Sequence, residues 1–193
     1  MPRPRTITDD AVLDAALDVM MKHGPAGATF ARLADATGLA TATLVQRFGS
    51  KPALVQAALL RGWDLLDART AAADHAAPPT VAGAVMLLVE LSSEYATGDA
   101  YADGLLLLRE DFRDPDLRKR GDRWGGYLAD ALGRRLGGAA GPRPDLGRLM
   151  ASQWQGDLVR KRRRERVQAA WEQFMLMEAE QRELEQLKES QLV

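Results

Sequence analysis

The sequence predicts an all-α protein of 193 residues, and three observations support this prediction. Alanine and leucine, both strong helix formers, dominate the chain. Apolar residues recur at helical spacing in several segments, and no segment alternates in the manner of a strand. Hydrophobic residues make up 46% of the chain, which suffices for a packed core. This length and composition suit either one globular unit or a small head plus a larger body, and we expect a helical head over residues 1–50 and a helical body over residues 51–193.

The head divides into short helices at its capping residues. Thr8 is placed to cap a first helix with acidic residues in its first turn, and Gly24 is placed to end it. Thr29 can cap a second helix. The third helix begins at either Ala40 or Thr41, and the sequence leaves this boundary open.

Residues 29–51 have the spacing of a helix-turn-helix. Ala34 supplies a small residue where two helices cross, and Gly38 supplies a residue that tolerates positive φ at the bend. Leu44, six positions later, can dock the next helix, although a generic helical hairpin would share these features. The outer side of that helix carries groups able to bond phosphates or base edges, namely Thr41, Thr43, Gln46 and Arg47.

The segment after this hairpin favours DNA binding. The hairpin ends in an aromatic residue that can pack against it, Phe48, followed by a turn at Gly49. Ser50 can then cap the next helix, and Lys51 lies in the first turn of that helix. A lysine at a helix N-terminus gains nothing from the helix dipole. An anion outside the protein, such as a DNA phosphate, would explain its position.

Residues 7–59 resemble the DNA-binding domain of TetR/AcrR-type bacterial transcriptional regulators. The matching stretches are Ala11–Leu17, Thr29-Phe30 with Leu33-Ala34, Gly38-Leu39 with Thr43-Leu44, and Phe48–Leu54. The chain departs from the family at Val45, where an aromatic residue is common, and at Ala42, where glycine is frequent. Residues and resemblance together predict a DNA-contacting set of Thr29, Arg32, Thr41, Ala42, Thr43, Val45, Gln46, Arg47 and Lys51.

The resemblance also implies how such a protein works. It implies a homodimer that binds a palindromic operator on double-stranded DNA, and a repressor that a small lipophilic effector releases. The alternative is a helical DNA-binding protein whose body serves protein–protein contact and takes no inducer.

The body is expected to contain further helices. Ser50 can cap a linking helix over about residues 50–72, and residues 74–79 read as a break because they contain two prolines. Expected helices then begin at Thr80, cover Tyr101–Phe112, and run from Asp114-Pro115-Asp116 to near Leu136. A flexible loop over Gly137–Pro144 precedes a long helical stretch from Asp145.

The tail over residues 157–193 is atypical of the family. Arg160–Arg166 is strongly basic, and Val167, Trp171 and Phe174 form one apolar stripe with Ala170 and Met177 beside it. The basic run is either a solvated helix face, a second DNA contact or part of a dimer interface, and the sequence leaves these readings open.

Large aromatic and methionine side chains are spread over several body helices. Such side chains line pockets between helices, and they equally form cores and dimer contacts. The resemblance implies that some of them line an effector cavity. The candidates are Trp63, Met86, Tyr95, Tyr101, Phe112, Trp124, Tyr127, Met150 and Trp154.

Charge and composition exclude several classes of function. The net charge of −1 is compatible with DNA binding because basic residues gather in the head, where Arg3 and Arg5 form a candidate arm. The chain has no cysteine, and His23 and His75 share no ligand spacing, so we expect no catalysis, metal or cofactor. The longest apolar run, Ala84–Val89, is too short to span a membrane. The basic residues at the start are not followed by the apolar segment that a signal peptide needs. We therefore expect a cytoplasmic protein.

Overall fold

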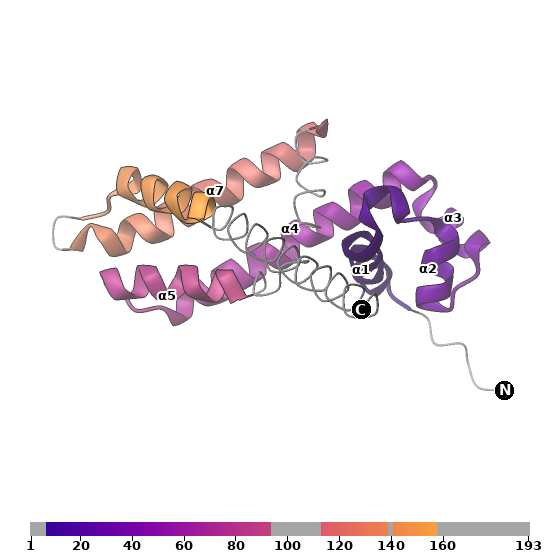
Figure 1. Ribbon diagram of the computed structural model, residues 1–193, viewed down its shortest axis with the longest axis horizontal. Coiled ribbons are helices and arrows are strands. Elements are labelled where there is room, and N and C mark those ends of the chain that lie inside the picture. Colours follow the sequence, from indigo (N-terminus) through magenta and orange to yellow (C-terminus); the bar gives the residue numbers. More distant parts are fainter. Residues whose placement is uncertain (1–6, 94–112, 139–140, 158–193) are drawn as a thin grey trace, which may run out of the picture. The chain divides into compact units, whose positions relative to one another are not determined.

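The computed structural model describes residues 7–93, 113–138 and 141–157, and every regular element within these ranges is a helix (Figure 1). The all-α prediction is therefore confirmed. The chain divides into two compact units, Met1–Gln153 and Trp154–Val193. The elements are α1 (Asp9–Gly27), α2 (Phe30–Thr37), α3 (Thr41–Phe48), α4 (Lys51–Ala76), α5 (Val81–Ser92) and α7 (Pro115–Leu136), and residues 144–157 are also helical.

Several predicted features lie outside the described residues. These are the arm with Arg3 and Arg5, the helix over Tyr101–Phe112, the basic run Arg160–Arg166 and the apolar stripe of the tail. The boundary predicted between head and body at residue 50 falls inside the first compact unit, and it stays a proposal.

Side-chain caps begin most of these helices, as the sequence predicts. The hydroxyls of Thr8, Thr29, Ser50 and Thr80 each accept a hydrogen bond from the backbone N–H three residues later. The Asp114 carboxylate accepts the Asp116 N–H in the same way at 2.8 Å. These bonds satisfy donors that the first helical turn would otherwise leave unpaired. The exception is α3, whose N-cap is Ala40 and has no side-chain cap.

Two predicted boundaries differ from the structure. Gly24 does interrupt α1, with φ of 68° and ψ of 169°, but one further turn through Pro25 carries the helix to Gly27. The linking helix α4 continues to Ala76, beyond the predicted end near residue 72, because its alanine-rich last turns favour helix. It ends at Ala77, which is extended at φ −80° and ψ 133° because the proline that follows disfavours the helical region.

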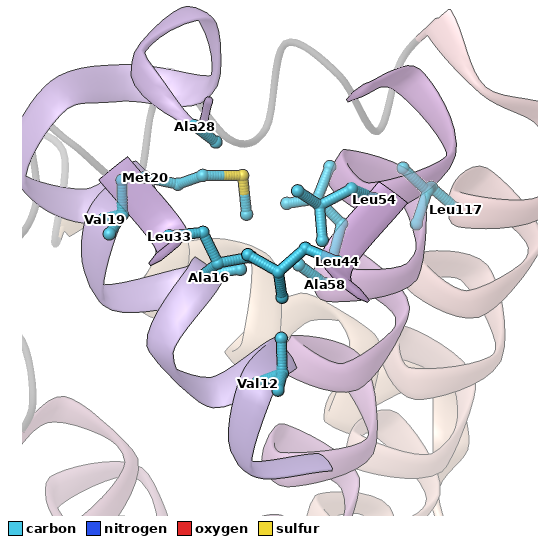
Figure 2. Packing of buried hydrophobic residues seen from close by; sticks show 11 residues of the cluster. Val12, Ala16, Val19, Met20, Ala28, Leu33, Leu44, Leu54, Ala58 and Leu117 are labelled. Carbon is cyan, nitrogen blue, oxygen red and sulfur yellow. The ribbon is translucent and has the colours of Figure 1, made fainter. Parts of the chain in front are cut away.

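The head has a compact apolar core that gathers side chains from α1, α2, α3 and the first half of α4 (Figure 2). Leu44 is fully buried in it, which confirms that this residue docks α3. The core also contains Leu117, which comes from α7 and is only 1% exposed. The full set of buried members is Val12, Ala16, Val19, Met20, Ala28, Leu33, Leu44, Leu54, Ala58, Leu59 and Leu117.

Helices α4 and α7 pack against each other along the body. The Trp63 and Trp124 rings lie 6.1 Å apart between centroids, and the Trp124 indole N–H donates to the Thr70 hydroxyl at 2.9 Å. Arginines on α7 pair with aspartates on α4 above and below this contact. These pairs are Arg120 with Asp64 and Asp67, Arg123 with Asp67, and Arg134 and Arg135 with Asp74.

Arg135 closes the far end of this helix pair. Its buried guanidinium donates to the carbonyls of Asp74, Ala77 and Pro78, where α4 ends and the chain turns toward α5. Burial by itself raises the pKa of the Asp74 carboxyl, but hydrogen bonds from Arg135 and Tyr127 outweigh it and hold that pKa below its ordinary value. No pattern in the sequence predicts this network, because its acceptors are mostly backbone carbonyls.

Candidate DNA interface

The exposed side of α3 is the centre of the candidate site. Thr41, Ala42, Val45 and Gln46 are all exposed, while Leu44 between them is buried. Residues spaced one, four and five positions apart lie on one side of a helix. We call these four residues the recognition face. None of them carries a charge.

The turn before α3 sets the angle between the two helices of the motif. Gly38 ends α2 in the left-handed region, at φ 71° and ψ 9°, and its N–H donates to the Ala34 carbonyl. A side chain at this position would be strained, so glycine is favoured here. The structure thus confirms the predicted bend, and two eight-residue helices flank it.

Arg47, predicted to contact phosphate, is held against the start of α1. Its Nη1 donates to the Ile7 carbonyl at 2.8 Å and to the Asp9 carboxylate at 3.3 Å. Its side chain is 23% exposed, so it lies at the edge of the recognition face. The contacts join the end of α3 to the residues where the arm enters α1.

Lys51 also has a partner within the protein. Its Nζ donates to the backbone carbonyl of Ala26, in the last turn of α1. This carbonyl accounts for a lysine at the start of α4 without an external anion. The ammonium has three N–H donors, so one such bond leaves the group able to meet a phosphate as well.

The other predicted DNA contacts lie on α2 and along α3. Thr29 is half-buried and caps α2, and Arg32 is exposed while its Nη1 donates to the Gly27 carbonyl at 3.0 Å. Thr43 is half-buried. The sequence does not reveal the partners of the head's cations, which are Ile7, Asp9, Ala26 and Gly27. Three of these four partners act through backbone carbonyls, which carry no residue-specific signal.

The predicted pocket residues that the structure describes come from several helices of the body, and their role as a pocket stays a prediction. Trp63 and Trp124 pack together, and the Tyr127 hydroxyl donates to Asp74 at 2.9 Å. Met86 is 55% exposed on α5, while Met150 and Trp154 are half-buried on the helix over residues 144–157. The remaining candidates, Tyr95, Tyr101 and Phe112, lie outside the described residues.

A buried docking leucine, a left-handed glycine bend and an exposed second helix define the head as a helix-turn-helix DNA-binding domain. Comparison with known families agrees, because residues 12–58 match the family described as bacterial regulatory proteins, tetR family. The match confirms the resemblance seen in the sequence: the protein carries the DNA-binding domain of TetR-family regulators and is a DNA-binding transcription regulator. No curated protein matches the chain.

Two further properties hold for the residues that the structure describes. No helix within those residues is long and apolar enough to cross a membrane. Within the same part of the chain, no three His, Asp or Glu side chains gather in a way that could hold a metal ion.

Proposed function

We propose that the protein is a homodimeric repressor that binds a palindromic operator and that a small lipophilic effector releases, with no catalytic step. The observation that carries this proposal is the coupling of the head to the body through Leu117. That side chain comes from a body helix and is buried in the core that positions α3. A ligand that displaces α7 would therefore disturb the domain that contacts DNA.

The second link between head and body supports the same proposal. Helix α4 runs without interruption for 26 residues from the head core to the contact with α5. At the head end, the Gln56 amide on α4 donates to the Asp114 carboxylate at 2.6 Å, directly before α7. Helices α4 and α7 are therefore linked to each other at the end where both contact the head core.

The DNA-contacting set is proposed with divided roles. Thr41, Ala42, Val45 and Gln46 face the major groove, because the second helix of such a motif enters it. The candidates for contact with sugar and phosphate are Thr29, Arg32, Thr43, Arg47 and Lys51. Arg47 and Lys51 also brace the head through their bonds to Ile7 and Ala26, so each would combine a structural with a binding role.

Selection from a pool of random duplexes tests the DNA-binding part of this proposal. We expect enrichment of an inverted repeat whose half-sites lie about one helical turn apart, since a two-fold dimer doubles the contacts of one small head. Sedimentation of the bound species should give two chains per duplex. Recovery of sequences without two-fold symmetry would contradict the dimeric mode.

A thermal-shift screen of lipophilic compounds, followed by titration calorimetry, tests the effector. A ligand that binds the folded state raises the melting temperature by mass action. By reciprocity, operator DNA must weaken effector binding by the same factor by which the effector weakens DNA binding. Equal effector affinities with and without operator would show that the compound does not regulate the protein.

One observation favours the second candidate function, a body used for protein–protein contact without an inducer. Val81, Val85, Met86 and Val89 are all exposed on α5, and they follow one another along one side of that helix. Exposed apolar patches often mark protein interaction sites. If this candidate is correct, Val85→Asp with Val89→Asp abolishes the protein contact, and the effector screen yields no compound that competes with operator.

A further inference from the structure

We propose that the recognition face reads A·T base pairs, with Val45 and Ala42 contacting thymine 5-methyl groups and Gln46 bonding an adjacent adenine. The inference rests on the proposed DNA-binding mode and adds the class of base that the site recognises. It rests on two observations about α3: which of its side chains are exposed, and which of them form hydrogen bonds within the protein.

The first step concerns the apolar half of the recognition face. Val45 is 42% exposed on a helix whose other apolar side chains, Leu44 and Phe48, turn inward. Ala42 lies one turn before it and is exposed as well. Neither side chain can form a hydrogen bond. The apolar group that the major groove offers such a surface is the 5-methyl group of thymine.

The second step concerns the polar half of the same face. Gln46 is exposed and follows Val45 directly, so it points to a neighbouring part of the groove. A glutamine amide has a donor and an acceptor that match N7 and the N6 amino group of adenine. The hydroxyl of Thr41, at the start of α3, can both accept and donate a hydrogen bond, so it fits either kind of base pair.

The third step explains why guanine is disfavoured. Guanine is read most often by an arginine or lysine that bonds O6 and N7. Arg47 is the one cation within α3, and its Nη1 is committed to the Ile7 carbonyl and the Asp9 carboxylate. Lys51 is held at the Ala26 carbonyl. Both contacts hold the guanidinium toward the start of α1, so reading guanine with Arg47 would compete with them.

Replacement of thymine by deoxyuridine in the selected operator tests the inference, because it removes only the 5-methyl group. Each thymine of one half-site would be replaced in turn, and the dissociation constant measured by fluorescence anisotropy. We expect one or two positions at which the loss of a methyl group weakens binding about fourfold, from the free energy of burying one such group. Val45→Ala should bind the thymine operator more weakly and lose most of the discrimination at one of these positions.

Leu65→Ala is the matched control, because Leu65 is an aliphatic residue on α4 outside the recognition face and is 43% exposed, close to the 42% of Val45. It should retain the full difference between thymine and deoxyuridine. Equal melting temperatures of the two variants would show that Val45→Ala leaves the fold intact.

The outcomes separate this inference from the proposed function. If the operator is bound but no deoxyuridine substitution changes affinity, the methyl contacts are refuted while DNA binding stands. A selected half-site made of G·C pairs would also overturn the inference and leave the regulator role intact. If selection recovers no specific duplex, both fall together.

Discussion

Replacing Leu117 by alanine should destabilise the DNA-binding head, although this residue belongs to a body helix. Leu117 is 1% exposed and lies in the cluster with Leu54 and Ala58 of α4 (Figure 2). Truncation to alanine removes three carbon atoms from that cluster and leaves a cavity between α4 and α7. The head would then lose its packed connection to the body.

The size of the effect follows from burial. A fully buried leucine replaced by alanine costs about 2–5 kcal/mol in free energy of unfolding. Domains are stable by about 5–15 kcal/mol in total, so the loss is a large fraction. At about 2–4 °C per kcal/mol, a cost near 3 kcal/mol lowers the melting temperature by roughly 6–12 °C.

Denaturant unfolding measures the total cost, and hydrogen exchange followed by mass spectrometry locates it. Amides of α1 and α3 should lose protection in Leu117→Ala, because local opening reports local stability. Leu65→Ala is the matched control, since Leu65 is on α4 and is 43% exposed. If the two variants unfold alike, or if exchange rises only in α7, then Leu117 does not support the head.

Three further predictions concern single side chains. Lys51→Ala should weaken binding to all duplexes by a similar factor and lower the slope of log affinity against log salt by roughly one, and an unchanged slope would leave Lys51 with only its bond to Ala26. Gln46→Ala should cost about 1–3 kcal/mol of operator binding and relax preference at one base pair in competition assays, whereas a uniform loss across sequences would assign Gln46 to the phosphates. Arg135→Met should cost about 3–5 kcal/mol in urea denaturation, because it removes a buried guanidinium that bonds the half-buried Asp74 carboxylate and the carbonyls at the end of α4. The lowered pKa of Asp74 means that its contribution to stability is present above the ordinary carboxyl pKa and is lost as the pH falls through the lower folded value. Acidification should therefore destabilise the wild type more than Arg135→Met, and parallel loss in both would refute the assignment.

The features that the sequence predicted correctly depend on local chemistry. Thr8, Thr29 and Ser50 were identified as caps because a capping hydroxyl acts on a backbone N–H three residues away. Gly38 was identified because a left-handed bend favours glycine. The predicted end of α4 near residue 72 is too early, because residues 74–76 continue the helix and the proline that stops it lies two residues further on.

The features that the sequence could not predict depend on contacts between distant segments. The sequence predicts an external anion as the partner of Lys51, but an internal carbonyl 25 residues earlier in the chain accepts a hydrogen bond from its ammonium. Leu117 looked like any apolar residue of a body helix, and only the packing of α7 against α4 brings it to the head. Likewise, the pairing of Trp63 with Trp124 depends on the register of two helices more than 50 residues apart.

The energetics of the α4–α7 pair indicate where an effector would have to act. The ion pairs of Arg120 and Arg123 with Asp64 and Asp67 are open to solvent on at least one side or only half-buried, and pairs that solvent screens contribute little stability each. The two ends are different, because Leu117 is buried in the head core and Arg135 is buried against the end of α4. The two anchored ends therefore set the register of α4 against α7, and the ion pairs between these ends can rearrange at a small cost in free energy. A ligand that only neutralised these pairs would change the head little. An effector that releases operator must instead displace α7 at one of its two anchored ends, and the Leu117 end is the one that lies in the head core.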